Sequence, residues 1–342
     1  MRRDVRHGSS DVGWRRRLRW SLAALAWILA GCGPPDIPSV PDNSAILDQF
    51  LSKPRIAGPD VGHYAGAGGA TLGFKAYRSE RPDRRLALVY FHGIESHADW
   101  FDEAARRLQT QGIDVFCLDR RGSGINRENR GFPSGHADSM AQLLADVDAF
   151  VQPLHGHYGR VVLVGLSWGG KLALAYGLEH PDAADGLVLI TPGLRSLVDV
   201  SGWTKLGILG ASWLAPRTPF AVPIEAPMFT TTPRHLDYIR SDPLRLTEAS
   251  AGFFMTSVAF DRYIDRRIAD NRLPVLLFLA GRDRIIDNDA VLSLLEMGKG
   301  AGLEVRQYPE QTHSIQFDAP EKMVTDISGW LAQRIPADEV AR

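Results

Sequence analysis

The chain is poor in cysteine and carries almost no net charge. Its 342 residues include two cysteines, Cys32 and Cys117, so a framework of several disulfides is excluded. Its 39 basic and 40 acidic residues give a net charge of −1, which offers no basic surface for a nucleic-acid partner. Apolar residues make up 44% of the chain, an ordinary share that predicts a folded protein with a substantial core.

The N-terminus lacks an apolar run long enough to span a bilayer comfortably, but it has the composition of an export signal. Residues 1–19 hold seven arginines, and Trp20–Ala30 is a short apolar segment. With the next two residues, the sequence Leu-Ala-Gly-Cys resembles the lipobox of bacterial lipoproteins. The resemblance implies a signal peptide over 1–31, an acylated Cys32 as a membrane anchor, and a place in the bacterial cell envelope. Gly33 after the cysteine would direct such a protein to the outer membrane under the enterobacterial sorting rule.

Removal of the predicted signal would leave an acidic protein. Residues 1–31 contain seven basic and two acidic residues, so the remainder carries 32 basic and 38 acidic residues, a net charge of −6. Such a surface does not attract anionic headgroups, and the lipid on Cys32 would have to hold the protein to the membrane. Cys117 lies in an apolar run and is predicted to be a buried, inert thiol. An ordinary signal peptide and an uncleaved anchor stay open as alternatives.

Residues 32–66 form the predicted tether and lead-in, and beyond them strand-like and helix-like segments alternate. Most of the strand-like segments are short and apolar, whereas the helix-like ones place apolar residues at helical spacing. The predicted strands are Thr71–Arg78, Leu86–Phe91, Ile113–Leu118, Val161–Val164, Gly186–Ile190, Pro274–Ala280 and Leu303–Tyr308. The predicted helices are Trp100–Gln111, Ser139–Val151, one that includes Leu172, Ala290–Met297 and Glu321–Ile335. This alternation predicts an α/β fold over 67–193 and 271–342, with a mostly parallel sheet and helices on both faces.

Residues 194–270 interrupt this alternation between two predicted strands. The segment is rich in tryptophan, phenylalanine and proline, and its aromatic residues include Trp203, Trp213, Phe220, Phe229, Phe253, Phe254 and Phe260. Most of these are expected to pack within the insertion itself. Ligands of parallel sheets bind at the carboxyl edge of the strands, so we expect the insertion to form a cap over a substrate pocket there.

The strongest candidate for chemistry is Ser167, in the sequence Gly165-Leu166-Ser167-Trp168-Gly169. An apolar strand-like run precedes the serine and a helical pattern follows it, which places the serine on a sharp strand-to-helix turn. The G-x-S-x-G nucleophile elbow requires this arrangement, because glycines leave room for a strained serine backbone. An inert glycine-rich turn is the alternative, since the pattern arises easily by chance in a chain with 33 glycines.

A nucleophilic serine needs an imidazole to take its proton and a carboxylate to orient that imidazole. His313 is the only histidine after the insertion, in a loop that follows the last predicted strand. Asp283 follows the strand Pro274–Ala280 and is the preferred acid, with Asp287 and Asp289 as nearby competitors. The three residues then occur in the order serine, acid, histidine, which is typical of this kind of site.

The oxyanion of an acyl-transfer intermediate needs two fixed N–H donors. One is predicted to be the backbone N–H of Trp168, directly after the nucleophile. The other is predicted to be the backbone N–H of Ile94, in the loop after the strand that ends at Phe91. His92 is predicted to brace this loop. Glu95 and His97 are predicted to be solvated, with contact to a polar head group as the alternative.

Five segments together resemble the α/β-hydrolase superfamily, in its monoacylglycerol lipase and lysophospholipase branch. They occur in family order and are H-G-I-E-S-H at 92–97, L-D-R-R-G-S-G at 118–124, G-L-S-W-G-G at 165–170, A-G-R-D-R-I-I-D at 280–287 and T-H-S at 312–314. The resemblance implies a carboxylic-ester hydrolase with a lid and with no metal or organic cofactor. Trp168 and the pair Arg120-Arg121 depart from the commoner residues of that branch, which bears on the substrate rather than on the chemistry.

These residues predict a serine hydrolase that works by two-step acyl transfer on an ester with an acyl chain. Monoacylglycerols and lysophospholipids are the substrates that the resemblance implies. An acyltransferase, an amidase or a peptidase would share the same residues, and a non-catalytic binding lipoprotein of the envelope is a further alternative. Epoxide hydrolases and dehalogenases of this fold use an aspartate nucleophile, which Ser167 argues against.

Overall fold

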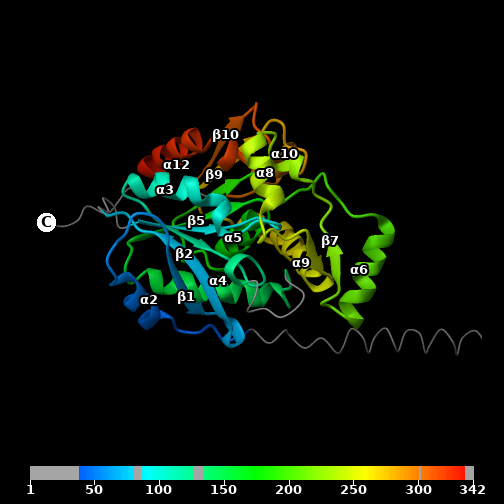
Figure 1. The fold of residues 1–342 in the computed structure, drawn as a ribbon, viewed down its shortest axis with the longest axis horizontal. Coiled ribbons are helices and arrows are strands. Elements are labelled where there is room, and N and C mark those ends of the chain that lie inside the picture. Colours follow the sequence, from blue (N-terminus) through cyan, green and yellow to red (C-terminus); the bar gives the residue numbers. More distant parts are fainter. Residues whose placement is uncertain (1–37, 81–85, 127–134, 300–301, 336–342) are drawn as a thin grey trace, which may run out of the picture. The chain divides into compact units, whose positions relative to one another are not determined.

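The computed structural model describes residues 38–80, 86–126, 135–299 and 302–335, which are drawn in colour in Figure 1. The predicted signal peptide, Cys32 and the first residues of the predicted tether lie outside these ranges. No helix within them combines the length and the hydrophobicity that crossing a membrane requires.

An eight-stranded sheet in the order β1-β2-β4-β3-β5-β6-β9-β10 forms the centre of this described part. Its strands are β1 Asp60–Ala65, β2 Thr71–Tyr77, β3 Leu86–Phe91, β4 Asp114–Leu118, β5 Arg160–Leu166, β6 Gly186–Ile190, β9 Val275–Ala280 and β10 Leu303–Tyr308. The strands from β4 to β10 in this order pair in parallel. Strand β2 pairs antiparallel with both β1 and β4. The predicted α/β fold with a mostly parallel sheet is therefore confirmed.

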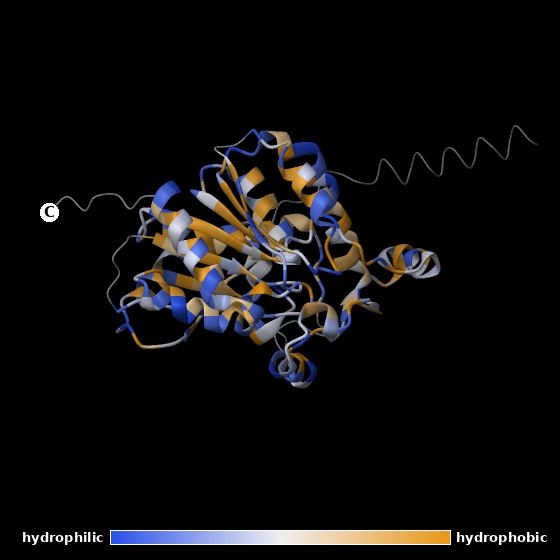
Figure 2. Cartoon of the chain, turned by 90° about the horizontal axis from the view of Figure 1, so that it is seen from above, coloured by the Kyte–Doolittle hydropathy of each residue, from blue (hydrophilic) through white to orange (hydrophobic). Residues whose placement is uncertain are grey.

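Helices cover both faces of the sheet. Figure 1 shows α3 and α12 on one side of the strands and α2 and α4 on the other. The helices of the sheet domain are α2 Ser44–Leu51, α3 Asp102–Thr110, α4 Met140–Leu154, α5 Trp168–Glu179, α10 Asn288–Leu295, α11 Ile315–Asp318 and α12 Pro320–Arg334. Figure 2 shows the strands between them as mostly hydrophobic. Apolar strands covered on both faces are typical of parallel sheets.

Strand β3 illustrates how this burial follows from the sequence. All six of its residues are buried. Val89 belongs to the core cluster that includes Phe150 of α4, whereas Tyr90 belongs to the cluster on the opposite face. There the Tyr90 ring stacks on Phe101, with the two ring centroids 4.2 Å apart. Because successive side chains of a strand point to opposite faces, an unbroken apolar run supplies both clusters at once.

Two elements lie inside the segment predicted to be a tether and lead-in. Helix α2 buries Leu47 and Phe50, and β1 extends the sheet beyond β2. The buried amide of Asn43 fixes the start of α2, because it donates to the carbonyl oxygens of Ala65 and Ala149 and accepts from the Ala65 N–H. The described fold therefore begins before the predicted boundary at residue 66 and includes α2 and β1.

Between β6 and β9 the chain leaves the sheet. This inserted segment contains α6 Gly202–Leu214, β7 Pro219–Ala221, α7 Ala226–Phe229, α8 Pro233–Ser241, β8 Glu248–Ser250 and α9 Ala251–Arg267. Strands β7 and β8 pair with each other and not with the central sheet. Figure 1 shows α6 at the right, at the edge farthest from the labelled strands of the sheet.

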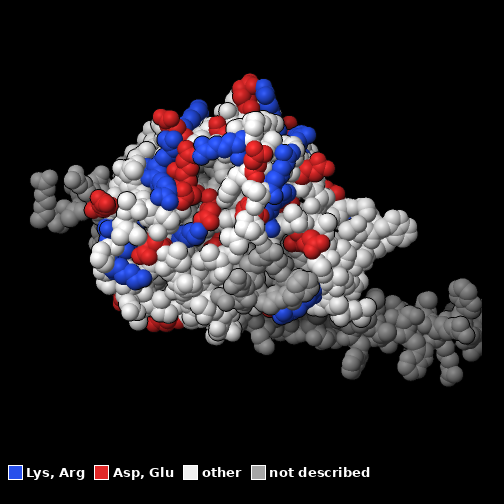
Figure 3. Space-filling view, in the orientation of Figure 1, with Lys and Arg blue, Asp and Glu red and all other residues white. Residues whose placement is uncertain are grey.

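The aromatic residues of the inserted segment fall into two groups. Phe229, Phe253 and Phe260 are buried, and their rings contact Trp100 and Trp168 of the sheet domain, not only side chains of the insertion. Trp203 and Trp213, in contrast, are 85% and 70% exposed. The reason is that α6 has only one buried residue. In Figure 3 the region around α6 shows almost no charged side chain, so its exposed surface is mainly uncharged in this view.

Candidate active site

Ser167 lies on a sharp turn between β5 and α5. Its backbone φ is 52°, a value that residues with a side chain rarely adopt. The Ser167 N–H donates to the Ile190 carbonyl, and the Ser167 carbonyl accepts from the N–H groups of Gly170 and Gly193. A Cβ at Gly169 would collide with the carbonyl of the residue that ends β3. The close approach of these backbones therefore requires the glycines of the motif, and it holds the strained serine in place.

His313 and Asp283 lie in the loops that follow β10 and β9. Their Nδ1 and Oδ2 atoms are 2.8 Å apart, and both side chains are almost completely buried. The other carboxylate oxygen of Asp283 accepts backbone N–H groups from Ile285 and Ile286, which fixes its orientation. Because a carboxylate oxygen accepts and the ring N–H donates, this contact places a proton on Nδ1 of His313, and in the neutral imidazole Nε2 then carries a lone pair. That Nε2 is buried and has no hydrogen-bond partner among the described residues.

The two competing acids have other roles. Asp287 is the N-cap of α10 and accepts the Ala290 N–H at 3.0 Å. Asp289 is an exposed residue in the first turn of the same helix. Among these three acids, the described contacts of the His313 ring therefore single out Asp283.

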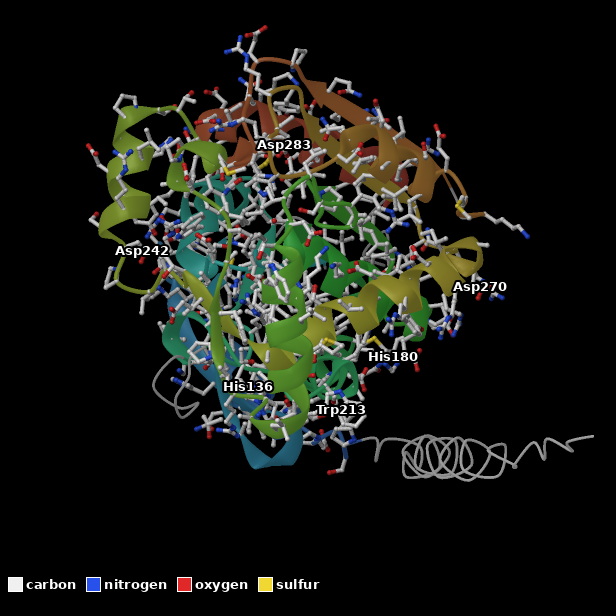
Figure 4. All side chains as sticks on the ribbon, turned by 90° about the vertical axis from the view of Figure 1, so that its right-hand side faces the viewer. His136, His180, Trp213, Asp242, Asp270 and Asp283 are labelled. Carbon is white, nitrogen blue, oxygen red and sulfur yellow. The ribbon has the colours of Figure 1, made fainter. Side chains whose placement is uncertain are left out.

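A buried threonine that the sequence analysis missed connects the histidine loop to the turn that carries Ser167. Thr191 directly follows β6, whose last carbonyl accepts the Ser167 N–H. Its hydroxyl donates to the His313 carbonyl at 3.0 Å, and its φ is 40°. No motif marks this residue, because its role depends on a contact 122 positions along the chain. Figure 4 shows Asp283 beside the loops at the upper end of the ribbon, from which the acid reaches His313.

The loop after β3 passes beside the nucleophile. A Cβ at Gly93 would lie 3.3 Å from the Ser167 Cβ, and Ile94 lines the same pocket as Ser167 and Trp168. Trp168 is the first residue of α5, so its N–H has no acceptor within the helix. His92 Nδ1 contacts the Gly93 carbonyl at 2.8 Å, which agrees with its predicted bracing of the loop. The two predicted oxyanion donors thus come from neighbouring backbone segments at one pocket.

Arg120 is a second residue whose role the sequence analysis did not identify. Its guanidinium donates to the Gly93 carbonyl at 2.8 Å and to the Ile94 carbonyl at 2.6 Å. It also lies 5.2 Å from the Trp168 ring centroid and 5.0 Å from that of Phe253. Burial lowers the pKa of Arg120 to about 9. The guanidinium therefore holds the loop that contains Ile94 against Trp168. The signal in the sequence that could have indicated this role was that Arg120 departs from the commoner residues of the branch that the chain resembles.

The prediction that Glu95 and His97 are solvated is wrong. Glu95 is buried and pairs with Arg245 of the inserted segment at 2.7 Å, and burial raises the Glu95 pKa to about 7 against the opposing effect of Arg245. His97 Nε2 contacts a carboxylate oxygen of Asp242 at 2.9 Å. The Leu246 N–H donates to the Glu95 carbonyl. These side chains dock the loop after β3 onto residues 242–246, which are distant in the sequence.

Ser167 opens into a pocket of about 250 Å³. The inserted segment supplies much of its apolar lining, including Val200, Val222, Ile224 and Phe254. The insertion therefore borders the pocket of the candidate nucleophile, where a cap was expected. In the described part of the chain, no group of three or more His, Cys, Asp or Glu side chains is arranged to hold a metal ion. The buried Cys117 forms no disulfide, and burial raises the pKa of its thiol.

Comparison with known proteins identifies the family of this chain. Residues 82–320 match the family Hydrolase_4, described as serine aminopeptidase, S33. The chain is 24% identical over 278 residues to a monoacylglycerol lipase of Mycolicibacterium smegmatis, covering 80% of this chain and 96% of that protein. It is 26% identical over 282 residues to the human monoglyceride lipase, covering 80% of this chain and 91% of that protein.

Solved structures share the fold. A soluble variant of the Saccharomyces cerevisiae monoglyceride lipase, solved with a substrate analogue, superposes with a TM-score of 0.73 at 18% identity, covering 82% of this chain and 97% of that one. The monoacylglycerol lipase of Paleococcus ferrophilus superposes with a TM-score of 0.68 at 20% identity, covering 77% of this chain and 99% of that one. At these identities the likeness establishes the α/β-hydrolase fold.

Proposed function

The chain belongs to the Hydrolase_4 family and is a carboxylic-ester hydrolase of the α/β-hydrolase fold, and we propose that it cleaves lipid-like esters through an acyl-enzyme on Ser167. The observation that carries this proposal is the buried Asp283–His313 pair, whose Nε2 is left without a partner in the described chain. In support, the Thr191 hydroxyl donates to the His313 carbonyl, and the preceding residue, Ile190, accepts the N–H of the strained serine.

In the proposed mechanism, Nε2 of His313 takes the proton of the Ser167 hydroxyl while the serine oxygen attacks the ester carbonyl. Asp283 keeps the imidazole oriented and stabilises its positive charge. The N–H groups of Ile94 and Trp168 donate to the oxyanion of the tetrahedral intermediate. His313 then protonates the leaving alcohol, and afterwards it activates the water that cleaves the acyl-enzyme.

The proposed substrates are monoacylglycerols or lysophospholipids. Relatives of the chain are named monoacylglycerol lipase, monoglyceride lipase and phospholipase. The lining of the Ser167 pocket is mainly apolar, which suits an acyl chain. The proposal that Cys32 is lipidated and anchors the protein in the bacterial cell envelope rests on the lipobox-like sequence alone. Metabolic labelling with a palmitate analogue, which a Cys32→Ser variant should not incorporate, tests it.

The test of the enzymatic proposal uses a Cys32→Ser protein without residues 1–31. Wild type and Ser167→Ala are treated with a fluorophosphonate probe and assayed on p-nitrophenyl butyrate and p-nitrophenyl dodecanoate. We expect labelling only with Ser167, and a loss of at least about 10³-fold in kcat on replacement. A folded wild type that neither reacts with the probe nor hydrolyses either ester would refute the proposal.

Two additions to this assay distinguish an ester hydrolase from a peptidase and from an acyltransferase. The family description names an aminopeptidase, so an amino-acid p-nitroanilide is included, and we expect its turnover to be much slower than that of the esters. Glycerol is added as an acceptor alcohol, and we expect free fatty acid as the main product. A transfer product in excess of free acid would identify an acyltransferase instead.

A further inference from the structure

One wall of the Ser167 pocket is polar, whereas most of its lining is apolar. Lys171, Ser257 and Asp261 line this wall. Lys171 follows the nucleophile by one turn of α5, so its side chain leaves the helix on the same face as Ser167. Ser257 and Asp261 lie one turn apart on α9 of the inserted segment. The wall therefore joins the nucleophile helix to the insertion.

The contacts of this wall are well defined. Lys171 Nζ lies 2.7 Å from Asp261 Oδ1 and donates to the Ser257 hydroxyl at 3.0 Å. The Trp168 indole N–H donates to the same hydroxyl at 3.1 Å. Only 7% of the Lys171 side chain is exposed, against 36% of Asp261. Burial lowers the pKa of Lys171 and raises that of Asp261, so both charges are partly desolvated.

Such a pair needs an explanation other than stability. Two charges moved out of water are often replaced by apolar side chains without loss of stability, so a buried pair in a pocket suggests a role in recognition. The wall also has hydrogen-bond donors and acceptors beyond those used in the contacts above. An ammonium group has three N–H donors, and two of those of Lys171 are engaged. Ser257 accepts two hydrogen bonds and retains its own O–H as a donor. No described residue donates to Oδ2 of Asp261.

The charges around the wall cancel. The Lys171 ammonium faces Asp261, and Asp265, one turn further along α9, pairs with Arg195 from the segment after β6 at 2.6 Å. Asp199, which also lines the pocket, pairs with Lys205. A pocket wall without net charge gives no general attraction for a phosphate. The wall does offer a hydrogen-bond donor and a hydrogen-bond acceptor side by side. A substrate hydroxyl group, which both accepts and donates a hydrogen bond, can use the two together.

We infer that Lys171, Ser257 and Asp261 form a subsite for an uncharged, hydroxyl-bearing alcohol part of the ester, while the apolar lining takes the acyl chain. This inference rests on the proposed function of the pocket. A neutral polyol monoester such as a monoacylglycerol fits the subsite, and an ester with a phosphorylated alcohol part does not. A site built to hydrogen-bond a hydroxyl discriminates strongly against an analogue that lacks it, because its own polar groups are then left unpaired.

The test compares three esters of one acyl chain: 1-decanoylglycerol, methyl decanoate and 1-decanoylglycerol 3-phosphate. The readout is the ratio of kcat/KM for the glycerol ester to that for the methyl ester. In the double variant Lys171→Met/Asp261→Asn we expect this ratio to fall about tenfold, mainly through KM on the glycerol ester. Wild type should prefer decanoylglycerol to its phosphate. The control Lys322→Met removes an exposed Lys–Asp pair on α12 and should leave the ratio unchanged.

Ser257→Ala keeps the ion pair and removes only a hydroxyl, so it decides the question if the double variant does not fold. We expect Ser257→Ala to lower the same ratio about threefold or more. An unchanged ratio in a folded variant would overturn the subsite, and so would equal losses on both esters, which indicate a structural role. A wild-type preference for the phosphate ester that Lys171→Met abolishes would identify an anion site instead. Wild type inactive on all three esters would refute the proposed function rather than the subsite.

Discussion

The central sheet and the inserted segment 194–270 use apolar residues in different ways. In the sheet, strands such as β3, β6 and β9 bury every residue between two layers of helices. In the insertion, α6 exposes most of its apolar side chains, with Trp203 at 85% and Leu214 at 90% exposure. Both regions contain many apolar residues in the sequence. Burial depends on whether a second layer covers the residue, so apolar content alone predicts a core only where layers are present on both sides.

The active-site loops are placed at the boundary of these two regions. Asp283 and His313 lie on loops of the sheet domain, and the insertion braces the His313 loop, because the Thr312 hydroxyl and the Ser314 N–H donate to the Phe229 carbonyl. Glu95 and His97 contact the insertion through Arg245 and Asp242. The candidate catalytic side chains therefore come from the sheet domain, whereas the insertion supports their loops and lines the pocket. Four predictions test this division, from the largest expected effect to the smallest.

Asp283→Asn should lower kcat about 10⁴-fold on a soluble ester, equivalent to about 5 kcal/mol, because the amide can no longer hold the imidazole in the required tautomer. The matched control is Asp287→Asn, which keeps an N-cap side chain on α10, so both stability and kcat should be nearly retained. Kinetics at saturating substrate and urea unfolding measure the two effects. A similar loss of kcat in both variants would contradict the assignment of the acid.

Gly169→Ala and Gly210→Ala place the same methyl group in a helix of each region. At Gly169 the new Cβ would collide with the Phe91 carbonyl, so we expect a loss of at least about 3 kcal/mol in the free energy of unfolding. At Gly210, in α6, the Cβ meets no atom within 4 Å, and the change should stabilise the protein by up to about 1 kcal/mol. Urea denaturation of both variants is the measurement. Equal effects would show that the two regions are packed alike.

Glu95→Gln should flatten the pH dependence of stability between about pH 4.5 and 7. The folded protein raises the Glu95 pKa from 4.5 to about 7, so in this window the folded state binds more protons than the unfolded state. Stability contributed by this group is therefore present at low pH and is lost as the pH rises, by about 3 kcal/mol across the window. Urea unfolding at pH 5 and pH 7.5 measures the slope, with exposed Glu103→Gln as the control. An unchanged slope in Glu95→Gln would count against burial of this carboxyl.

The double variant Trp203→Ser/Trp213→Ser should change the free energy of unfolding by less than about 0.5 kcal/mol per position, because both rings are already exposed. Trp330→Ala removes a fully buried ring of α12 and should cost about 3–5 kcal/mol. Thermal and urea unfolding compare the two. A large loss in the surface variant would indicate that α6 packs against another part of the molecule.

Much of the fold could be predicted because its signals are local. The apolar runs that became β3 and β6 have the predicted bounds, since a strand covered on both faces needs every residue apolar. The antiparallel strand β1 could not be predicted in this way. Its six residues alternate in burial and include His63 and Gly62, and it is held by pairing with β2 and by the Asn43 amide.

The residues of the candidate site also differ in whether a local sequence pattern could predict their contacts. The serine turn has a local signature, because the collision of backbones at Gly169 requires glycine whatever the rest of the chain does. The partners of Arg120 and Glu95 carry no such signature. Arg120 is held by carbonyls 26 and 27 positions earlier, and Glu95 by Arg245, 150 positions later. The sequence marks these residues as charged, which by itself favours a solvated surface.

The sequence alone determined the alternation of strands and helices, the serine turn and the order in which serine, acid and histidine occur. The alternation and the serine turn depend on steric and hydrophobic rules that act over a few residues. Only the tertiary structure decided which charges are buried, which tryptophans of the insertion face outward, and that Lys171 lies in the Ser167 pocket beside Asp261. Those outcomes depend on which distant segment packs over a side chain, and a local sequence pattern does not specify that segment.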